Sequence, residues 1–302
     1  FLPSIGRLNR YKGPVENANV RVDTGVYEGG EISMYYDPMI AKLVTYGDDR
    51  AEALSHMQAA LDAYYIRGVS HNIGFLAALV AHPKFAAGDM TTNFIADEYP
   101  DGFHPQDLPS EDSTIQIAVA ASVHRAYQQR AAEISGQTPD HERQVSDDWV
   151  GVLKDGDHPV TVRVAADGFF VIIEGTTHEL QTDWKLGETL MRGNLDGRNI
   201  CIQVERQNIS YRLTHAGSQD DILVLSPRHA ELNTHMLVKE PPDTSKLLLS
   251  PMPGLLVSVA VESGQEIKSG EELAVIEAMK MENVLRAERD GRISTVKAAA
   301  GD

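Results

Sequence analysis

The pattern of hydrophobic and polar positions divides the chain into three regions. Up to about residue 98, short extended runs are followed by two helical patterns. A helical pattern that begins near Ser113 is followed by eight short β runs between Trp149 and Ser226, and further short β runs fill the chain beyond residue 248. The pattern predicts an α+β unit, then an antiparallel sheet accompanied by a long helix, then a small all-β unit.

In the first region, the extended runs 20–22 and 40–44 predict strands, and the residues after them predict helices. Leu54, Met57, Leu61 and Tyr64 recur at helical spacing, with Asp49 placed to cap the helix and Gly68 to end it. A second helix is expected from about Asn72, capped by Ser70 or Asn72. The region contains no Gly-rich phosphate loop.

In the second region, the helical pattern is apolar on nearly every side and then turns polar at residues 127–130. Its apolar residues are Ile115, Ile117, Ala118, Val119, Ala120, Ala121, Val123 and Ala126. A helix that is apolar all round must be buried all round. The β runs that follow are separated by turn pairs such as Asp155-Gly156, Asp167-Gly168 and Asp196-Gly197. We therefore predict an antiparallel β-barrel wrapped around this helix.

Composition narrows the function. The 302 residues carry a net charge of -17, which argues against a nucleic-acid groove or an anionic membrane as the main partner. No apolar run approaches transmembrane length. The single Cys201 lies in an alternating strand pattern, where we expect a small core residue and no internal disulfide. The histidines of the second region lack the paired spacings of a metal site and are interpreted as structural or solvated.

The third region offers candidate chemistry at one lysine. The buried β run 273–276 and a second run around Val284 predict a hairpin with Lys280 near its tip. Lysine suits a carrier arm because its stem is flexible and its amine can be acylated. In the alternative reading, Met279 and Met281 are core filler and Lys280 is an ordinary solvated side chain.

An internal repeat favours the carrier reading. Residues 254–265 recur without a gap as 291–302, with glycines, branched apolar residues and a closing Gly-polar pair aligned. Two half-repeats around one hairpin lysine are typical of the flattened, quasi-twofold barrels of biotinyl and lipoyl carrier domains. The flanks Met279 and Met281 favour biotin on Lys280. The second half-repeat stops before a counterpart of the strand that leads to Lys280, so we expect the last strand of this barrel to be missing.

The first region resembles the final subdomain of a biotin carboxylase. The resemblance is carried by residues 1–6, 20–23, 35–43 and 68–72. It implies that Arg21 holds bicarbonate and stabilises the biotin ureido oxyanion, and that an ATP-grasp portion with the ATP, Mg²⁺ and bicarbonate ligands precedes this sequence. From the residues alone, Arg21 also fits a salt bridge at a strand edge.

The order of regions, with residues 99–103 and 230–233, resembles the alpha subunits of biotin-dependent acyl-CoA carboxylases, the propionyl-CoA branch in particular. The resemblance implies that the middle domain docks onto a carboxyltransferase beta subunit. The polar stretch from about Gly136 to Asp148 is our candidate contact element, with a plain connector as the alternative.

These inferences combine into a multidomain α+β fold. We expect a biotin carboxylase C-terminal subdomain over 1–98, truncated at its N-terminal side, a helix-in-barrel docking domain over 99–238, a linker over 239–247 and a biotinyl carrier barrel over 248–302. The resemblance implies that Lys280 carries carboxybiotin to the beta subunit, which carboxylates propionyl-CoA to methylmalonyl-CoA. Alternatives are a methylcrotonyl-CoA carboxylase alpha subunit, or a carrier and docking scaffold without activity. Pyruvate carboxylase is disfavoured because no metal-binding carboxyltransferase region is present.

The resemblance also implies partners and a compartment. Besides the beta subunit, we expect biotin protein ligase and other alpha subunits as partners, and neither nucleic acid nor a membrane. The chain would be cytoplasmic in a bacterium and would lie in the mitochondrial matrix in a eukaryote.

Overall fold

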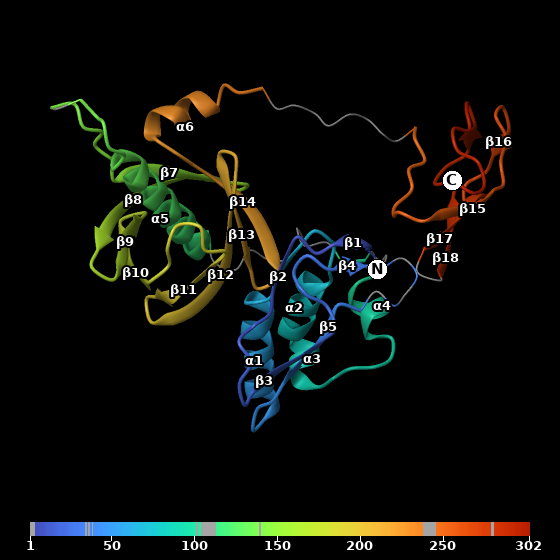
Figure 1. Cartoon of the computed structure of the whole chain (residues 1–302), viewed down its shortest axis with the longest axis horizontal. Coiled ribbons are helices and arrows are strands. Elements are labelled where there is room, and N and C mark those ends of the chain that lie inside the picture. The colour runs from blue at the N-terminus through green and yellow to red at the C-terminus, as the bar shows by residue number, and fades with distance from the viewer. Residues whose placement is uncertain are drawn as a thin grey trace.

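The computed structural model describes residues 4–33, 35, 37, 39–100, 102–103, 113–138, 140–237, 246–278 and 281–302. Figure 1 shows three parts: the N-terminal region with α1 to α4, a barrel that surrounds α5, and a small β unit that carries the C-terminus. Among the described residues, no helix is both long and apolar enough to span a membrane.

The N-terminal region pairs short strands and packs helices against them. The strand pairs are β1 (Gly6–Arg7) with β4 (Glu31–Ile32), β2 (Arg10–Lys12) with β6 (Tyr65–Arg67), and β3 (Val20–Thr24) with β5 (Ala41–Thr45). The helices are α1 (Arg50–Asp62), α2 (Ile73–Ala81), α3 (Pro83–Ala87) and α4 (Phe94–Glu98). Both predicted strands and both predicted helices are present.

Helix α1 begins as predicted but ends earlier. The Asp49 side chain accepts a hydrogen bond from the Glu52 amide and caps the N-terminus. The helix stops at Asp62, so the prediction that it continues through Tyr64 to Gly68 is wrong. Residues 65–67 instead pair with β2, and Gly68 has a φ of 109° after that strand. A Cβ at Gly68 would lie 2.1 Å from the Arg7 carbonyl oxygen. Glycine is therefore needed at this position because two backbone segments approach each other closely.

The middle of the chain forms a closed barrel of eight antiparallel strands, as predicted. The strands are β7 (Asp148–Leu153), β8 (Gly156–Ala165), β9 (Gly168–Ile173), β10 (Thr176–Thr182), β11 (Leu190–Leu195), β12 (Arg198–Gln207), β13 (Ser210–His215) and β14 (Ser218–Leu225). Sequential strands pair, and β14 closes the barrel on β7. A short helix, α6 (Pro227–Asn233), follows β14.

Two-residue turns set the strand register of this barrel. Glu174 and Gly175, between β9 and β10, both have positive φ, and so do Asp196 and Gly197 between β11 and β12. Positive φ at both central residues gives a hairpin turn whose twist matches that of the flanking strands. The turn pairs in the sequence therefore mark where the strands reverse.

Helix α5 (Ser113–Ala132) lies against the inner face of the barrel strands. Its residues Ile117, Val119 and Val123 are at most 1% exposed. They belong to one apolar cluster with barrel residues that include Val162, Val171, Leu180, Met191, Ile202 and Ile222. Figure 1 shows α5 within the barrel formed by β7 to β14. The barrel and the helix thus share a single core.

His124 of α5 is partly buried among aromatic residues of the barrel. His124 packs edge-on against the Trp149 ring, its Nδ1 lies 3.1 Å from the Tyr211 hydroxyl, and the Gln128 amide nitrogen lies 3.1 Å from its Nε2. Burial, with smaller contributions from Arg206 and Arg143, lowers the pKa of His124 to about 4. The neutral imidazole is therefore the form that fits the folded barrel.

We expect acid to destabilise the barrel through this histidine. Since the pKa of His124 is lower in the folded than in the unfolded chain, the unfolded chain binds the proton first. The folding stability is therefore unaffected by this group above about pH 6.5 and falls by roughly 3 kcal/mol as the pH drops toward about 4. Denaturant unfolding at about pH 7 and about pH 4.5 should show a smaller loss of stability for His124→Leu than for wild type. The exposed His229→Gln variant is the control, and an equal loss in all three proteins would contradict the assignment.

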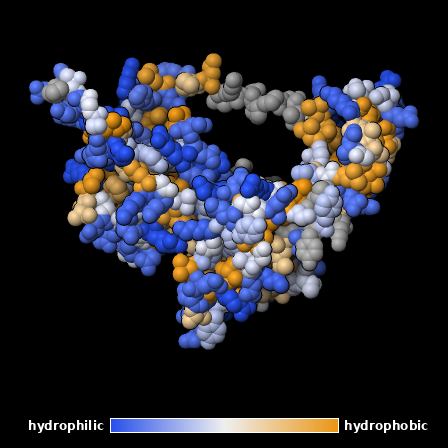
Figure 2. Space-filling model, in the orientation of Figure 1, coloured by the Kyte–Doolittle hydropathy of each residue, from blue (hydrophilic) through white to orange (hydrophobic). Residues whose placement is uncertain are grey.

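The C-terminal unit is built from two small sheets. The first contains β15 (Leu255–Val259), β17 (Glu272–Ala278) and β18 (Met281–Arg286), and the second contains β16 (Glu266–Ile267) and β19 (Gly291–Arg292). The predicted flattened barrel is therefore observed as two separate small sheets and not as one closed sheet. Figure 2 shows apolar side chains at the surface of this unit, and Leu247, Leu248, Leu249 and Leu255 are among its exposed residues.

Candidate functional site

The predicted hairpin is formed by β17 and β18. Its strands pair from Glu272 opposite Arg286 to Ala278 opposite Met281. Met279 and Lys280, the residues between the two strands, lie outside the described residues. Ala278 is buried, whereas Met281 is 46% exposed, and Glu277 and Glu282 are exposed. The hairpin is therefore anchored through β17 and has accessible side chains where its strands end.

The two half-repeats around this hairpin exchange equivalent hydrogen bonds. The Gly264 amide donates to the Ile293 carbonyl at 2.7 Å, and the Gly301 amide donates to the Leu256 carbonyl at 2.8 Å. Gly264 and Gly301 stand 37 positions apart, as do Leu256 and Ile293, which is the shift that aligns the repeats. The reverse bonds, from Ile293 to Gln265 and from Leu256 to Asp302, obey the same shift. The sequence repeat is thus a structural quasi-twofold relation.

The segment before β15 packs closely against the hairpin. A Cβ at Gly254 would lie 2.6 Å from the Glu277 carbonyl oxygen, so only glycine permits this approach without a shift of the backbone. Met252 is buried, and its sulfur lies 3.8 Å from the Asn283 amide nitrogen. Residues on both hairpin strands are therefore supported by the turn that opens the first half-repeat.

Arg21 lies on β3, opposite Val44 of β5, with its side chain 65% exposed. Its Nε lies 3.1 Å from Asp23 Oδ1 and its Nη2 lies 3.3 Å from Asp23 Oδ2, so the two side chains make a bidentate pair. The strand-edge salt bridge considered from the sequence is therefore present. An exposed pair of this kind leaves the guanidinium accessible to an anion.

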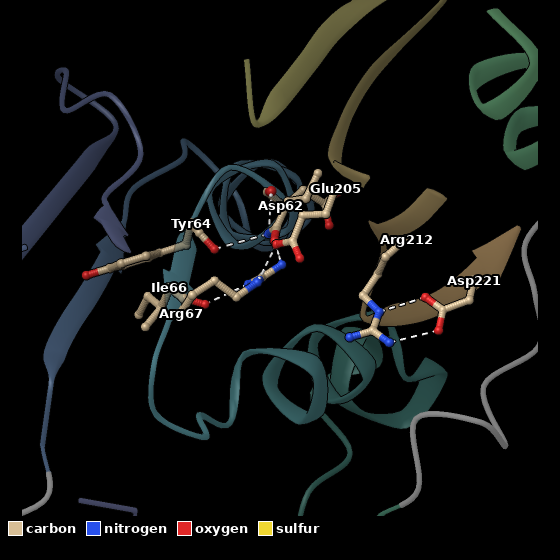
Figure 3. Close-up of polar contacts among 8 residues, drawn as sticks. Asp62, Tyr64, Ile66, Arg67, Glu205, Arg212 and Asp221 are labelled. Carbon is tan, nitrogen blue, oxygen red and sulfur yellow. Dashed lines mark hydrogen bonds and ion pairs between the residues drawn. The ribbon is translucent and has the colours of Figure 1, made fainter. Parts of the chain in front are cut away.

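The structure also reveals a polar contact that the sequence does not single out. Gln203 of β12 is only 3% exposed and bonds to the end of α1, while Arg67 of β6 pairs with Glu205 of β12 (Figure 3). On the neighbouring strands, Arg212 and Asp221 form a bidentate pair at 2.7 and 2.8 Å. The one signal in the sequence is a glutamine within the otherwise apolar stretch 200–204.

The expected core position of Cys201 is not borne out by the structure. Cys201 is only partly buried and stands outside the apolar cluster that contains Ile200 and Ile202, and it lines an open groove together with residues of α1. The strand alternates, and the odd position faces α1 rather than the barrel interior. Burial nevertheless raises the pKa of its thiol.

The histidines of the barrel region contact carboxylates and backbone atoms. His158 lies 3.2 Å from Asp155, His178 lies 2.6 Å from Asp196, and His215 lies 3.2 Å from the Cys201 carbonyl oxygen. Among the residues with described placement, no cluster of His, Cys, Asp and Glu could hold a metal ion.

Comparison with known families matches all three regions in the order predicted. Residues 1–97 match the biotin carboxylase C-terminal domain, residues 117–239 match the propionyl-coenzyme A carboxylase BT domain, and residues 246–302 match a family described as biotin-requiring enzyme. The chain belongs to the biotin-dependent acyl-CoA carboxylase family. The match over 246–302 indicates covalent biotin as the cofactor of this family member.

Individual relatives place the chain within this carboxylase family. It is 46% identical over its whole length to the propionyl-CoA carboxylase alpha chain of Ruegeria pomeroyi and 41% identical to the mitochondrial one of Mus musculus, of which it covers 47% and 42%. It is 31% identical to the mitochondrial methylcrotonoyl-CoA carboxylase subunit alpha of Dictyostelium discoideum, over 98% of this chain and 44% of that protein. The chain therefore spans about half the length of the curated relatives it matches.

Proposed function

We propose that this chain supplies the biotin carrier, a docking barrel and part of the biotin carboxylase of a propionyl-CoA carboxylase alpha subunit. The observation that carries the proposal is the match at 46% identity over the whole of this chain, against 31% for a methylcrotonoyl-CoA relative. The reaction would be the ATP-dependent carboxylation of propionyl-CoA to methylmalonyl-CoA, completed on a separate beta subunit. The chain would work in the bacterial cytoplasm or the mitochondrial matrix, according to its organism.

Four segments would divide this work. We assign 1–98 to the biotin carboxylase, 99–238 to docking of the beta subunit, 239–247 to a linker and 248–302 to the carrier. A tethered carrier raises the concentration of its cargo at two sites in turn. The separation of the small β unit from the barrel in Figure 1 is consistent with this division.

Lys280 would hold the biotin, in an amide bond to its side-chain nitrogen. The hairpin suits such a group, because Ala278 is buried and anchors it while Met281, Glu277 and Glu282 are exposed where the strands end. Biotin supplies a ureido nitrogen that can take up and release a carboxyl group. Met279 and Met281 would flank it, offering polarisable surface to biotin protein ligase and to the two active sites.

Arg21 would act at the biotin carboxylase site. A fixed guanidinium is planar, permanently charged and able to bind a carboxylate-like anion with two hydrogen bonds. Asp23 holds the Arg21 side chain through both of its oxygens, which orients the guanidinium. In the complete enzyme, Arg21 would hold bicarbonate and stabilise negative charge that develops on the ureido oxygen. ATP and Mg²⁺ would be bound by an ATP-grasp portion of the same subunit.

Substrate choice is tested with the complete alpha subunit assembled with its beta subunit. Labelled bicarbonate should be incorporated in the presence of ATP with propionyl-CoA, and much more slowly with methylcrotonyl-CoA. The reverse preference would favour the methylcrotonyl-CoA alternative. Incorporation with neither acyl-CoA, on a subunit that carries biotin, would leave only the carrier and docking scaffold.

The docking assignment has its own test. The residues between α5 and β7 extend past the end of the barrel (Figure 1), and the exposed stretch 140–144 lies among them. A complete alpha subunit lacking residues 99–247 should no longer retain the beta subunit in a pull-down. Continued loading of its carrier with biotin is the control for folding, and equal retention of the beta subunit would refute docking through this domain.

A further inference from the structure

The contact between the N-terminal region and the barrel is centred on the buried Gln203 side chain. Its amide nitrogen lies 3.1 Å from the carbonyl oxygens of both Asp62 and Tyr64, and donates to them. Its amide oxygen accepts a bond from Arg67 Nη2, also at 3.1 Å. In Figure 3, Asp62 at the end of α1 and Arg67 of β6 lie beside Glu205 of β12, the strand that carries Gln203. A glutamine used on both its donor and acceptor sides fixes its neighbours in one arrangement.

The Gln203 side chain donates a hydrogen bond to a carbonyl oxygen at the end of α1 that has no partner within the helix. The last carbonyls of a helix have no partner within the helix. Helix α1 has no basic residue in its last turn, and Tyr64 follows the C-cap residue Ala63 at the position where common C-terminal motifs have glycine. The barrel thus supplies a C-terminal cap to a helix that lies about 140 residues earlier in the sequence. Without the Gln203 side chain, the Asp62 carbonyl oxygen would lose this hydrogen bond at a buried position, which is costly.

The Asp62 side chain, at the end of α1, in turn accepts a hydrogen bond from the barrel. Its carboxylate is only 8% exposed, and Oδ1 accepts a 2.8 Å hydrogen bond from the amide of Ala216. Ala216 lies in the turn between β13 and β14 with a φ of 50°, an unusual value for alanine. Oδ2 lies 3.4 Å from His215 Nδ1. The barrel therefore stabilises the end of α1, and Asp62 of α1 stabilises the turn between β13 and β14 of the barrel.

A partly buried ion pair extends this contact. Arg67 pairs with Glu205, and their side chains are 27% and 18% exposed. The Arg67 guanidinium also lies over the Tyr65 ring, 4.4 Å from its centre. Because salt screens a partly buried ion pair less than a surface pair, the attraction between Arg67 and Glu205 is stronger than it would be on the surface. Arg67 thus links β6, Gln203 and Glu205 in one network.

We propose that Gln203, Asp62 and Arg67 form a rigid joint that holds the biotin carboxylase subdomain in one orientation on the docking barrel. This inference rests on the proposed function. With the barrel bound to the beta subunit, the joint would set the distance between the carboxylation and transfer sites, so that only the carrier has to move. The three residues would be positioning residues, because none of them contacts the reacting groups.

The test uses the complete alpha subunit assembled with its beta subunit. Gln203→Met keeps the length of the side chain but removes all three hydrogen bonds, and Gln219→Met makes the same change at an exposed position of the same barrel. In Gln203→Met, we expect amides of residues 58–68 and 211–218 to exchange hydrogen at least about fivefold faster. We expect overall carboxylation to fall at least about fivefold while carboxylation of free biotin changes less than about twofold. Gln219→Met should change neither.

Two results would overturn the joint. Unchanged hydrogen exchange in Gln203→Met would show that this residue holds nothing together. A parallel fall in overall activity and free-biotin carboxylation, seen also in Arg67→Met, would assign the network to the stability of one active site rather than to positioning. Failure of the proposed function is distinguishable, because it would abolish acyl-CoA carboxylation in the wild type while leaving the hydrogen-exchange comparison intact.

Discussion

Replacing Lys280 by arginine is expected to leave the carrier without biotin and the complete enzyme without overall carboxylation. Biotin protein ligase would need the lysine amine as a nucleophile, and an arginine guanidinium stays protonated with its charge delocalised over the whole group. The substitution keeps the positive charge and a similar length, so the fold of the hairpin should be preserved. Intact-mass measurement after co-expression with the ligase should show one biotinyl group on wild type and none on Lys280→Arg.

Another lysine of the same unit provides the control. Lys268 is 85% exposed and is followed by β17 after a short turn. Lys268→Arg should be biotinylated like the wild type. Modification that persists in Lys280→Arg, or that is lost in Lys268→Arg, would refute Lys280 as the attachment site. Free-biotin carboxylation should continue in both variants, because the carboxylase site does not depend on the carrier lysine.

Replacing Arg21 by glutamine is expected to slow the carboxylation of free biotin by about a hundredfold or more, the usual effect of removing a group that stabilises transition-state charge. Glutamine can still donate a hydrogen bond, but it carries no charge and cannot bind an anion in bidentate fashion. The rate should be measured on the complete alpha subunit at saturating ATP and bicarbonate. The loss should be mainly in kcat if Arg21 acts on charge that develops during the reaction.

Arg10 is a matched control for this substitution. Its side chain is also 65% exposed, and it pairs with Glu28 at 3.2 Å as Arg21 pairs with Asp23. Each substitution should cost less than about 1 kcal/mol of folding stability, because exposed ion pairs contribute little. Arg10→Gln should therefore retain activity. Equal activity in the Arg10→Gln and Arg21→Gln enzymes would leave Arg21 as nothing more than a surface salt bridge.

Local sequence signals predict much of this fold because they act over short distances. A Gly-containing turn pair specifies a hairpin regardless of the rest of the chain, and Glu174-Gly175 and Asp196-Gly197 are such turns. The internal repeat can also be recognised in the sequence alone. Gly264 and Gly301 occupy equivalent positions in the two half-repeats, and they make equivalent hydrogen bonds. The carrier hairpin and the eight-stranded barrel could therefore be predicted without any relative.

Long-range interactions account for what the sequence could not reveal. Helical spacing predicts that α1 includes Tyr64, but the pairing of residues 65–67 with β2 ends the helix at Asp62. Nothing near Gln203 in sequence indicates that its partners lie in α1 and β6. Cys201 alternates as a core residue would, yet it faces α1, because the strand is covered on its outer side as well. In each case a distant segment determines the outcome.

Closure of the β7 to β14 barrel limits how a beta subunit could recognise it. Each strand of this sheet already has a neighbour on both sides, with β14 bonded to β7 and β9 bonded to β10. A partner could not join by adding a strand of its own, because β-augmentation requires an open sheet edge. Binding would have to use side chains and connecting segments, so its specificity would lie in residues that can change without disturbing the barrel. Related subunits could then choose different partners on one conserved framework.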